Sequence, residues 1–552
     1  MTISPHPKGR EARVLLTSVF GPYAQDDEFG SRSINPMELF HNQVTREQGP
    51  FSLRMFHRSW GLMFIQANIL APSVLLDFPT RDRFLEEISK HRYDVIGITS
   101  IVMNIGKVRE MCRLIRERSP QSQIIVGGHV AAVSGLEEMI DADHIVRGEG
   151  VRWLRTYLGA DPDQPVRHPT ILSGFGQRAF GMGAATGPET RAATIIPSVG
   201  CPLGCNFCAT SEFFGGKGNF KNFYNSGAEL FEVMRGIADR EGIRSFFVMD
   251  ENFLLHRRRA LELLELMKQH GKAWSLYLFA SANALAKYSM EELVELGVAW
   301  VWMGLESPNS SYKKLGGVDI KKLVGELQRN GVKILGSTII GLDHHTPQNI
   351  RAEVDYAVSH ATDFHQFMLY TPLPGTPLHR EMEESGRMLE DVDPADIHGQ
   401  FQFNFRHKAI SRDESGRFLN WAFRRDYEVN GPSLFRVCRT DFLGWRRYRN
   451  HPDERISERF QREARELHRN YVAILWAMEK YLRDVNPRVV ESIRGLRGEI
   501  QREFGGLTSF FANLGGPFVL WNSRKEARRL AAGKTYEPQT FVERRNWAAE
   551  EA

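Results

Sequence analysis

The chain has few cysteines, no long apolar run and little net charge, so it lacks the usual marks of secreted, membrane-spanning and nucleic-acid-binding proteins. It has only five cysteines in 552 residues, which fits a reducing cytoplasm. It has no run of about twenty apolar residues, so no transmembrane helix is expected. Residues Met1–Arg10 lack the apolar core of a signal peptide. The net charge of +4 is small for this length and does not by itself indicate a nucleic-acid partner.

Three of the cysteines nevertheless lie together. Cys201, Cys205 and Cys208 form a C-x3-C-x2-C pattern in a loop rich in glycine and proline, and Cys112 and Cys438 are far away in sequence. Thiolates are the usual ligands of iron–sulfur clusters. A structural zinc site normally needs a fourth Cys or His, and none follows within about forty residues. The pattern predicts a 4Fe–4S cluster with one open iron; the alternative is three buried free cysteines.

With Phe207 directly before the last cysteine, the segment resembles the radical S-adenosylmethionine (SAM) superfamily. The resemblance implies that Cys201, Cys205 and Cys208 bind the cluster and that the amino and carboxylate groups of SAM chelate the open iron. One electron from the reduced cluster would then split SAM into methionine and a 5′-deoxyadenosyl radical. Phe207 matches the aromatic residue that packs near the adenine.

The first 160 residues alternate apolar runs with amphipathic helical patterns. Val14–Phe20 is such a run, and Arg81–His91 is such a helix. Strands that alternate with helices predict a doubly wound parallel sheet, whose ligands lie beyond the carboxyl ends of the strands. The loops expected at those ends are Ser100–Lys107, Gly127–Ala132 and Arg147–Gly150.

From about Val14 to Gly159 the chain resembles the cobalamin-binding domain that precedes many radical SAM cores. The residues that this resemblance assigns to cobalamin are Ser100, Gly127, Gly128, His129, Gly148 and Glu149. The family's D-x-H-x-x-G signature should follow the first strand, but residues 18–27 contain no histidine. Bound cobalt would therefore lack that lower ligand. His129 and His144 remain open to two interpretations, as ligands or as ordinary loop and core-edge histidines.

Roughly two to four domains are expected for this length. Residues 161–192 are predicted to be a linker. Six strand–helix units over residues 193–395 predict an open parallel barrel, the radical SAM fold by resemblance, with active residues at the carboxyl ends of its strands. Acidic groups there suit the SAM ammonium group. The resemblance assigns SAM binding to Asp250, Glu251, Asn252, Ser281, Asn283, Gly304, Glu306, Ser307, Ile340 and Thr371. It assigns no catalytic residue.

Residues 396–552 are predicted to form a mainly helical substrate or cap domain. Within it, residues 401–470 carry 16 Lys and Arg against 10 Asp and Glu, interleaved with aromatic residues. This pattern is typical of a solvated helical face over an aromatic core, or of a surface that meets a membrane or an anionic, lipid-like substrate. No sustained basic run indicates nucleic acid. With Cys438 alone, the region cannot hold the second cluster of a methylthiotransferase.

The leading hypothesis is a cobalamin-dependent radical SAM methyltransferase that acts on an unactivated carbon. Its expected cofactors are a 4Fe–4S cluster, SAM and cobalamin. Its expected partners are a small-molecule or lipid-like substrate and an electron donor such as flavodoxin or ferredoxin. One alternative is radical SAM coupling, cyclisation or rearrangement without methyl transfer. Another is a non-catalytic iron–sulfur sensor or carrier, which leaves Glu306 and the other strand-end motifs without a purpose.

Overall fold

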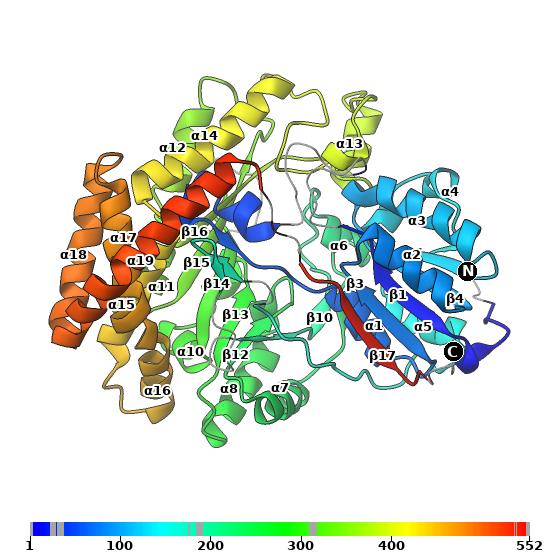
Figure 1. The fold of residues 1–552 in the computed structure, drawn as a ribbon, viewed down its shortest axis with the longest axis horizontal. Coiled ribbons are helices and arrows are strands. Elements are labelled where there is room, and N and C mark those ends of the chain that lie inside the picture. The colour runs from blue at the N-terminus through cyan, green and yellow to red at the C-terminus, as the bar shows by residue number, and fades with distance from the viewer. Residues whose placement is uncertain are drawn as a thin grey trace.

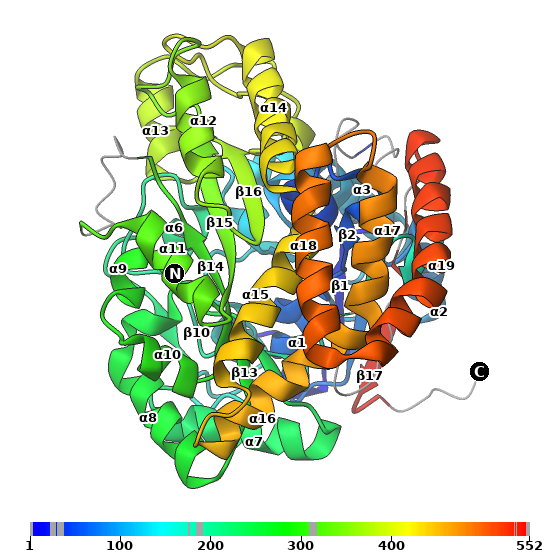
Figure 2. The ribbon, with the colours of Figure 1, turned by 90° about the vertical axis from the view of Figure 1, so that its left-hand side faces the viewer.

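The computed structural model describes residues 4–21, 29, 38–174, 177–183, 191–307, 317–534, 536 and 538–547. Two six-stranded sheets organise these residues, one formed mainly by the N-terminal third of the chain and one by its middle (Figure 1). Most of the remaining chain is helical and lies beside the second sheet (Figure 2).

The N-terminal sheet is doubly wound, as predicted. Its strands run parallel in the order β3-β1-β4-β5-β6. They are β1 (Val14–Ser18), β3 (Ser73–Asp77), β4 (Val95–Thr99), β5 (Gln123–Gly127) and β6 (His144–Ile145). The helices are α1 (Trp60–Ala67), α2 (Arg81–Lys90), α3 (Ile105–Arg118), α4 (Leu136–Met139) and α5 (Gly150–Tyr157). Leu15 packs toward α2 and α3, whereas Leu16 packs toward α1 and α5, so helices cover both faces and the strands are continuously apolar.

The end of the chain returns to this sheet. Strand β17 (Phe541–Arg545) pairs antiparallel with β3 at the sheet edge. Trp547 then packs against Tyr93 at 5.3 Å between ring centroids, and Arg13 lies over its ring. Residues 396–552 are expected to be mainly helical, and β17 is an exception to that expectation. Its partner lies more than 450 residues earlier, which local periodicity cannot reveal.

The second sheet is the predicted open barrel of parallel strands, which follow one another in chain order. They are β9 (Ala193–Ile195), β12 (Ser245–Val248), β13 (Ser275–Phe279), β14 (Val298–Gly304), β15 (Lys333–Ile340) and β16 (Phe364–Leu369). The accompanying helices are α7 (Gly227–Glu241), α8 (Arg257–Gln269), α9 (Ala282–Leu285), α10 (Met290–Glu295), α11 (Ile320–Arg329), α12 (Ile350–Val358) and α13 (Pro377–Glu384). Parallel, sequential strands bring all the predicted strand-end motifs to one edge.

Two local details differ from the expectation. The first strand of the predicted barrel is interrupted after β9 and resumes as β10 (Ser198–Val199), because Pro197 has no N–H to continue the ladder. Part of the predicted linker is paired: β7 (Arg178–Ala179) lies antiparallel to β2 (Leu53–Arg54) and to β8 (Met182–Gly183). These residues therefore form a small sheet rather than a free connection.

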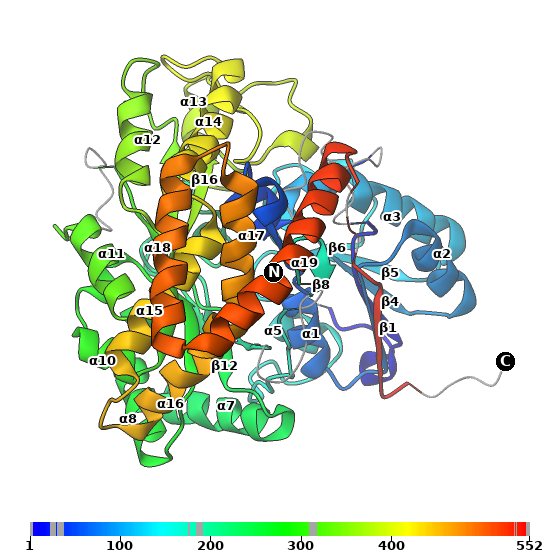
Figure 3. The same ribbon diagram turned by 60° about the vertical axis from the view of Figure 1, so that its left-hand side comes forward.

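The C-terminal helices are α14 (Arg412–Asn430), α15 (Ser433–Tyr448), α16 (Glu454–Glu463), α17 (Val472–Leu482), α18 (Pro487–Phe504) and α19 (Gly506–Ala531). Figure 3 shows α19 on the outside of the molecule, alongside α17. Several cations of the aromatic, basic stretch are paired with acids. Arg446 and Arg449, for example, contact Glu499 and Glu503. No helix in the described ranges is both long and apolar enough to cross a membrane.

Candidate active site

The three clustered cysteines lie in one loop whose base is closed by strand pairing. β10 pairs antiparallel with β11 (Lys221–Asn222), on the far side of the loop. Within the loop, the Cys208 N–H donates to the Cys205 carbonyl at 3.0 Å, and the Ser211 hydroxyl donates to the Cys201 carbonyl at 2.7 Å. Gly204 has a φ of +62°, and a Cβ there would lie 2.4 Å from Lys217. The backbone thus holds the three sulfurs in one turn.

The electrostatics of this loop fit a metal cluster. None of the three cysteines forms a disulfide bond in the described structure, and all three are half-buried. Burial, together with the neighbouring Cys208 and Cys205, raises the pKa of Cys201 to about 11. Three thiolates so close together repel one another unless a cation neutralises them. Iron bound by the three sulfurs would offset both the burial of the thiolates and their mutual repulsion. The residues present therefore suit the predicted cluster.

Asp250, at the carboxyl end of β12, is already fully engaged. Its carboxylate accepts from the Arg259 guanidinium and the Ser198 hydroxyl, and from the Asn252 N–H at 3.0 Å. The side chains of Asp250 and Arg259 are both 3% exposed. The ion pair holds the loop after β12 to α8, and the Ser198 hydrogen bond ties the same loop to the strand that leads to the cysteines.

Asn252 and the end of β13 form a second closed network. The Asn252 side chain donates to the Ser281 hydroxyl at 2.9 Å and accepts from the Ser281 N–H at 3.0 Å. The Ser281 hydroxyl in turn donates to Asn283 at 2.5 Å. Ser281 and Asn283 therefore tie two strand ends together.

Glu251 differs from its two neighbours. Its Oε2 is buried and has no hydrogen-bond partner among the described residues. Burial raises the pKa of its carboxyl group to about 7, while the N–H of Gly200, just before Cys201, lowers it. A buried, unpaired carboxylate oxygen beside the cysteine loop fits a cationic ligand group such as an ammonium. Of the three acidic and amide residues after β12, Glu251 is the one with a side-chain oxygen that can still accept a hydrogen bond from a ligand.

The ends of β14 and β15 enclose a small pocket of about 10 Å³, lined by Glu306, Ser307 and Ile340 among others. Glu306 has a φ of +50°, an uncommon conformation for a residue with a side chain. A Cβ on Gly304 would lie 2.6 Å from the Glu306 carboxylate, so a side chain at position 304 would displace that carboxylate. The Ser307 hydroxyl donates to Glu353 of α12 at 2.7 Å.

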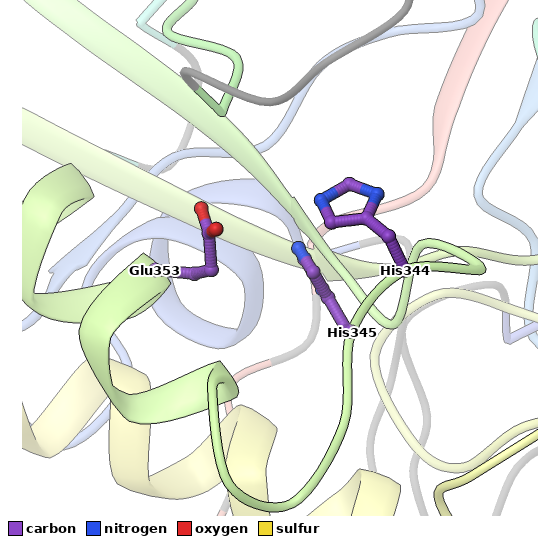
Figure 4. A group of neighbouring side chains, drawn as sticks. All are labelled: His344, His345 and Glu353. Carbon is purple, nitrogen blue, oxygen red and sulfur yellow. The ribbon is translucent and has the colours of Figure 1, made fainter.

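Three side chains that the sequence did not single out lie together here: His345 and Glu353 line the same pocket, and His344 lies beside them. His344 and His345 follow β15, and Glu353 comes from α12; Figure 4 shows them converging. One candidate ligand atom from each lies within 4.8 Å of the others. The only sequence signal is a pair of adjacent histidines after a strand-end glycine.

The hydrogen bonding of His345 does not fit a metal ligand. Its Nδ1 accepts from the Gly341 N–H at 2.9 Å, which places the proton of the neutral ring on Nε2. Burial lowers the pKa of His345 to about 4, so the ring stays neutral near pH 7. Nε2 is buried without a hydrogen-bond partner in the described structure. His345 therefore offers the pocket a hydrogen-bond donor and no free lone pair.

Phe207 and Thr371 meet where the cysteine loop contacts the last barrel strand. The Phe207 ring lies 6.3 Å from that of Tyr370, edge to face. Thr371 is buried and its hydroxyl donates to the Leu369 carbonyl at 2.9 Å. The Asn206 carbonyl accepts from the Leu378 N–H of α13 at 3.0 Å. These contacts seat the loop on the end of β16.

A second, larger cavity of about 330 Å³ lies between the N-terminal sheet and the segment after the cysteine loop. Its walls come from α1, α5, the ends of β4 and β5, and from Phe213 and Phe214. The cavity brings together five of the six residues predicted for cobalamin: Gly127, Gly128, His129, Gly148 and Glu149. Its lining is mainly apolar, as expected where a large organic group is bound.

Ser100, the sixth residue, lies behind this wall. A Cβ on Gly128, whose φ is +82°, would come within 2.5 Å of the Ser100 carbonyl oxygen. Gly128 is therefore required for two loops to approach each other. Glu149 caps α5, where its carboxylate accepts from the N–H groups of Val151 and Arg152. The close approach at Gly128 and the Glu149 cap thus fix the backbone at the edge of the cavity.

The two histidines that sequence analysis left open are in different surroundings. The His129 ring lines the cavity and stacks on Phe213 at 5.0 Å, with Nε2 3.5 Å from the Thr210 hydroxyl. His144 packs edge-on against Trp153 and Tyr157 of α5. His144 is thus a packing residue in this fold, and His129 faces the space that a ligand would occupy.

One short helix connects the two candidate sites. Cys208 caps the first turn of α6 (Ala209–Phe213), and Phe213 at its other end forms a wall of the cavity. Five residues of α-helix span about 7.5 Å. On the other side, a Cβ on Gly375 would lie 2.8 Å from Ala132 of the N-terminal domain. The cysteine loop and the cavity are therefore neighbours held by direct contact between the domains.

Comparisons with known proteins match two separate regions of the chain. The profile of the radical SAM superfamily matches residues 195–357, and that of the B12 binding domain matches residues 66–157. Bacteriochlorophyllide d C-12(1)-methyltransferase of Chlorobaculum tepidum is 27% identical over 43% of this chain and 56% of its own length. Bacteriochlorophyllide d C-8(2)-methyltransferase of the same organism is 25% identical over 58% of this chain and 74% of its own. The chain thus spans little more than half of the first of these relatives.

The hopanoid C-2 methylase of Rhodopseudomonas palustris is 27% identical over 36% of this chain and 39% of its own length. Among solved structures, the radical SAM methyltransferase TsrM from Kitasatospora setae, with cobalamin and a [4Fe-4S] cluster bound, superposes with a TM-score of 0.50. That match covers 82% of this chain and 98% of TsrM at 17% identity, which is a likeness of fold.

Proposed function

We propose that this chain, a member of the radical SAM superfamily with an N-terminal B12-binding domain, is a cobalamin-dependent methyltransferase that acts on an unactivated carbon. The observation that carries the proposal is α6, which begins at a cluster cysteine and ends in the wall of the B12-side cavity. A reaction that uses two cofactors on one substrate needs them close together. The relatives named above are methyltransferases, which supports the same reaction class.

In this proposal, Cys201, Cys205 and Cys208 hold the 4Fe–4S cluster, and the cavity between the sheets holds cobalamin. When bound, the cluster supplies the electron that cleaves SAM, and the cobalamin supplies the carrier for the methyl group. Glu251 would accept the SAM ammonium group with its unpaired oxygen. The Nε2–H of His345 would donate to an oxygen of SAM at the pocket that Glu306 lines.

The barrel favours an apolar substrate. Phe247, Phe279 and Trp302 come from neighbouring strands and alternate with the residues buried under the outer helices, so they face the barrel interior. Their ring centroids are 5.6 and 4.9 Å apart in a row, and all three rings are partly exposed. A small-molecule or lipid-like substrate would pack on this row. An electron donor such as flavodoxin or ferredoxin is required to reduce the cluster.

The by-products test the reaction class. Anaerobically reconstituted protein, given reductant, SAM and a candidate substrate, should form 5′-deoxyadenosine and S-adenosylhomocysteine together, and only with cobalamin present. The first arises from radical formation and the second from methyl transfer. Formation of 5′-deoxyadenosine alone, independent of cobalamin, would replace this proposal by the non-methylating radical reaction. Formation of neither product with a fully loaded cluster favours the non-catalytic iron–sulfur protein.

Gly127→Leu should project a side chain into the cavity and reduce cobalamin uptake at least about tenfold, because that side chain occupies ligand volume. Gly127 lines the cavity, and a Cβ there meets nothing closer than 3.9 Å, so the substitution strains no backbone. Uptake is measured by the visible spectrum of the desalted protein. Gly236→Leu, at an open position on α7, is the matched control and should bind normally. Equal uptake by both variants would remove the cavity as the cobalamin site.

Glu306→Gln should weaken SAM binding about tenfold or more while leaving the cluster intact, because a hydrogen bond to a charged group contributes ~1.5–3 kcal/mol. Glu306 is held over Gly304 in a left-handed conformation, which Gln can also occupy. Calorimetry on the cluster-loaded protein measures the affinity. Unchanged affinity would show that Glu306 has only a structural part in the pocket.

A further inference from the structure

Helix α19 packs onto the C-terminal bundle by one face only. On that face Ala512 and Val519 are buried in the core shared with α17. Gly516 lies so close to Trp476 of α17 that a Cβ would come within 2.5 Å of its ring, and a Cβ on Gly515 would lie 3.0 Å from Ala473. The small residues of α19 thus mark its contact with α17.

The opposite face of α19 carries a stripe of large apolar side chains exposed to solvent. Among the described residues, eight large hydrophobic side chains are exposed, and five of them are on this helix. They are Leu507 (72% exposed), Phe510 (58%), Leu514 (66%), Phe518 (59%) and Trp521 (55%). Their spacing of three or four residues places all five within a narrow arc of the helix. A solvated surface helix normally carries polar residues on that side.

The stripe continues into cations, and no acidic side chain among the described residues forms a salt bridge with them. Lys525 and Arg528 follow Trp521 at helical spacing and are exposed, and Lys525 lies 5.5 Å from the Trp521 ring. The single acidic residue of α19, Glu526, is buried and paired with Arg529. An apolar arc with aromatic residues that ends in unopposed cations is the pattern of a helix lying in the interface of an anionic membrane.

We propose that the exposed face of α19 docks this protein on the surface of an anionic lipid bilayer. The five side chains would enter the acyl boundary, and Lys525 and Arg528 would contact phosphate headgroups. A second copy of the chain fits less well. At roughly 200 Å² for each side chain, of which 55–72% is exposed, the five side chains offer about 600 Å² of accessible surface. This area is below the ~800 Å² that each partner of a standard stable interface buries.

Flotation of the full-length protein with vesicles tests the proposal. The protein should float with vesicles of equal parts phosphatidylcholine and phosphatidylglycerol, and much less with phosphatidylcholine alone. Leu514→Glu with Phe518→Glu should abolish flotation, because two carboxylates would have to enter the apolar layer. Lys525→Gln with Arg528→Gln should weaken partitioning about 25-fold at low salt, from the loss of two headgroup contacts.

Val485→Glu is the matched control, since Val485 is 70% exposed but lies between α17 and α18, off the stripe. It should float like the parent protein. Equal circular dichroism and cluster content of all variants exclude misfolding as the cause of a loss. No flotation of the parent protein, or equal flotation of the Leu514→Glu, Phe518→Glu variant, would overturn the proposal. A dimer in sedimentation that this variant dissociates would also overturn it and assign the stripe to a second copy.

Discussion

Cys205→Ala is expected to remove both the broad absorbance at about 400 nm of a cysteine-ligated cluster and all SAM cleavage. The loop offers three sulfurs. The two other cysteines of the chain lie in separate hydrophobic cores and cannot replace a missing ligand. With two thiolates, the cluster has too few protein ligands to be held with one iron open. Cys201→Ala and Cys208→Ala should have the same effect. SAM cleavage by the Cys205→Ala protein would disprove the cluster assignment.

The two remaining cysteines are the controls for this experiment. Cys112 is fully buried in the core of the N-terminal sheet, and Cys438 is fully buried in the C-terminal helical core. Burial raises the pKa of Cys112 to about 12 and that of Cys438 well above its ordinary value, so both remain neutral thiols. Cys112→Ala and Cys438→Ala should therefore keep the absorbance and the cleavage.

The sequence predicted those parts of the fold that depend on local pattern. Buried strands such as β1 and β4 were found because helices cover both faces and leave continuous apolar runs. β17 was missed because it is a strand of only five residues with no buried apolar run. Its position in the sheet depends on pairing with β3, which is distant in sequence. The exposed stripe on α19 was missed for a related reason. Large apolar residues on a helix are typical of a buried face, and only the structure shows that α17 covers the other face of α19.

At the site, the sequence predicted which residues lie together better than it predicted which of them can contact a ligand. The strand-end residues do converge, because sequential parallel strands end at one edge. Which of Asp250, Glu251 and Asn252 has a free acceptor depends on Arg259 and Ser281, whose side-chain contacts no motif encodes. The donor on His345 likewise depends on one backbone N–H, that of Gly341.

Glu251→Gln and Asp250→Asn should have opposite consequences, although the two residues are adjacent. Glu251→Gln removes a carboxylate that is partly buried and has one oxygen without a partner, so the stability of the protein should not fall. SAM affinity should fall roughly tenfold to a hundredfold, because a charged hydrogen bond of ~1.5–3 kcal/mol is lost. Calorimetry with SAM and the denaturant midpoint of the same anaerobic preparation measure the two effects.

Asp250→Asn should instead destabilise the barrel by about 3–5 kcal/mol, because it leaves the buried Arg259 cation without its counter-charge. The denaturant midpoint should fall sharply. Where the protein remains folded at low temperature, SAM affinity should change less than in Glu251→Gln, since the Asp250 oxygens are taken by Arg259, Ser198 and the Asn252 N–H. The reverse result, a stable Asp250→Asn protein that no longer binds SAM, would transfer the ammonium contact from Glu251 to Asp250.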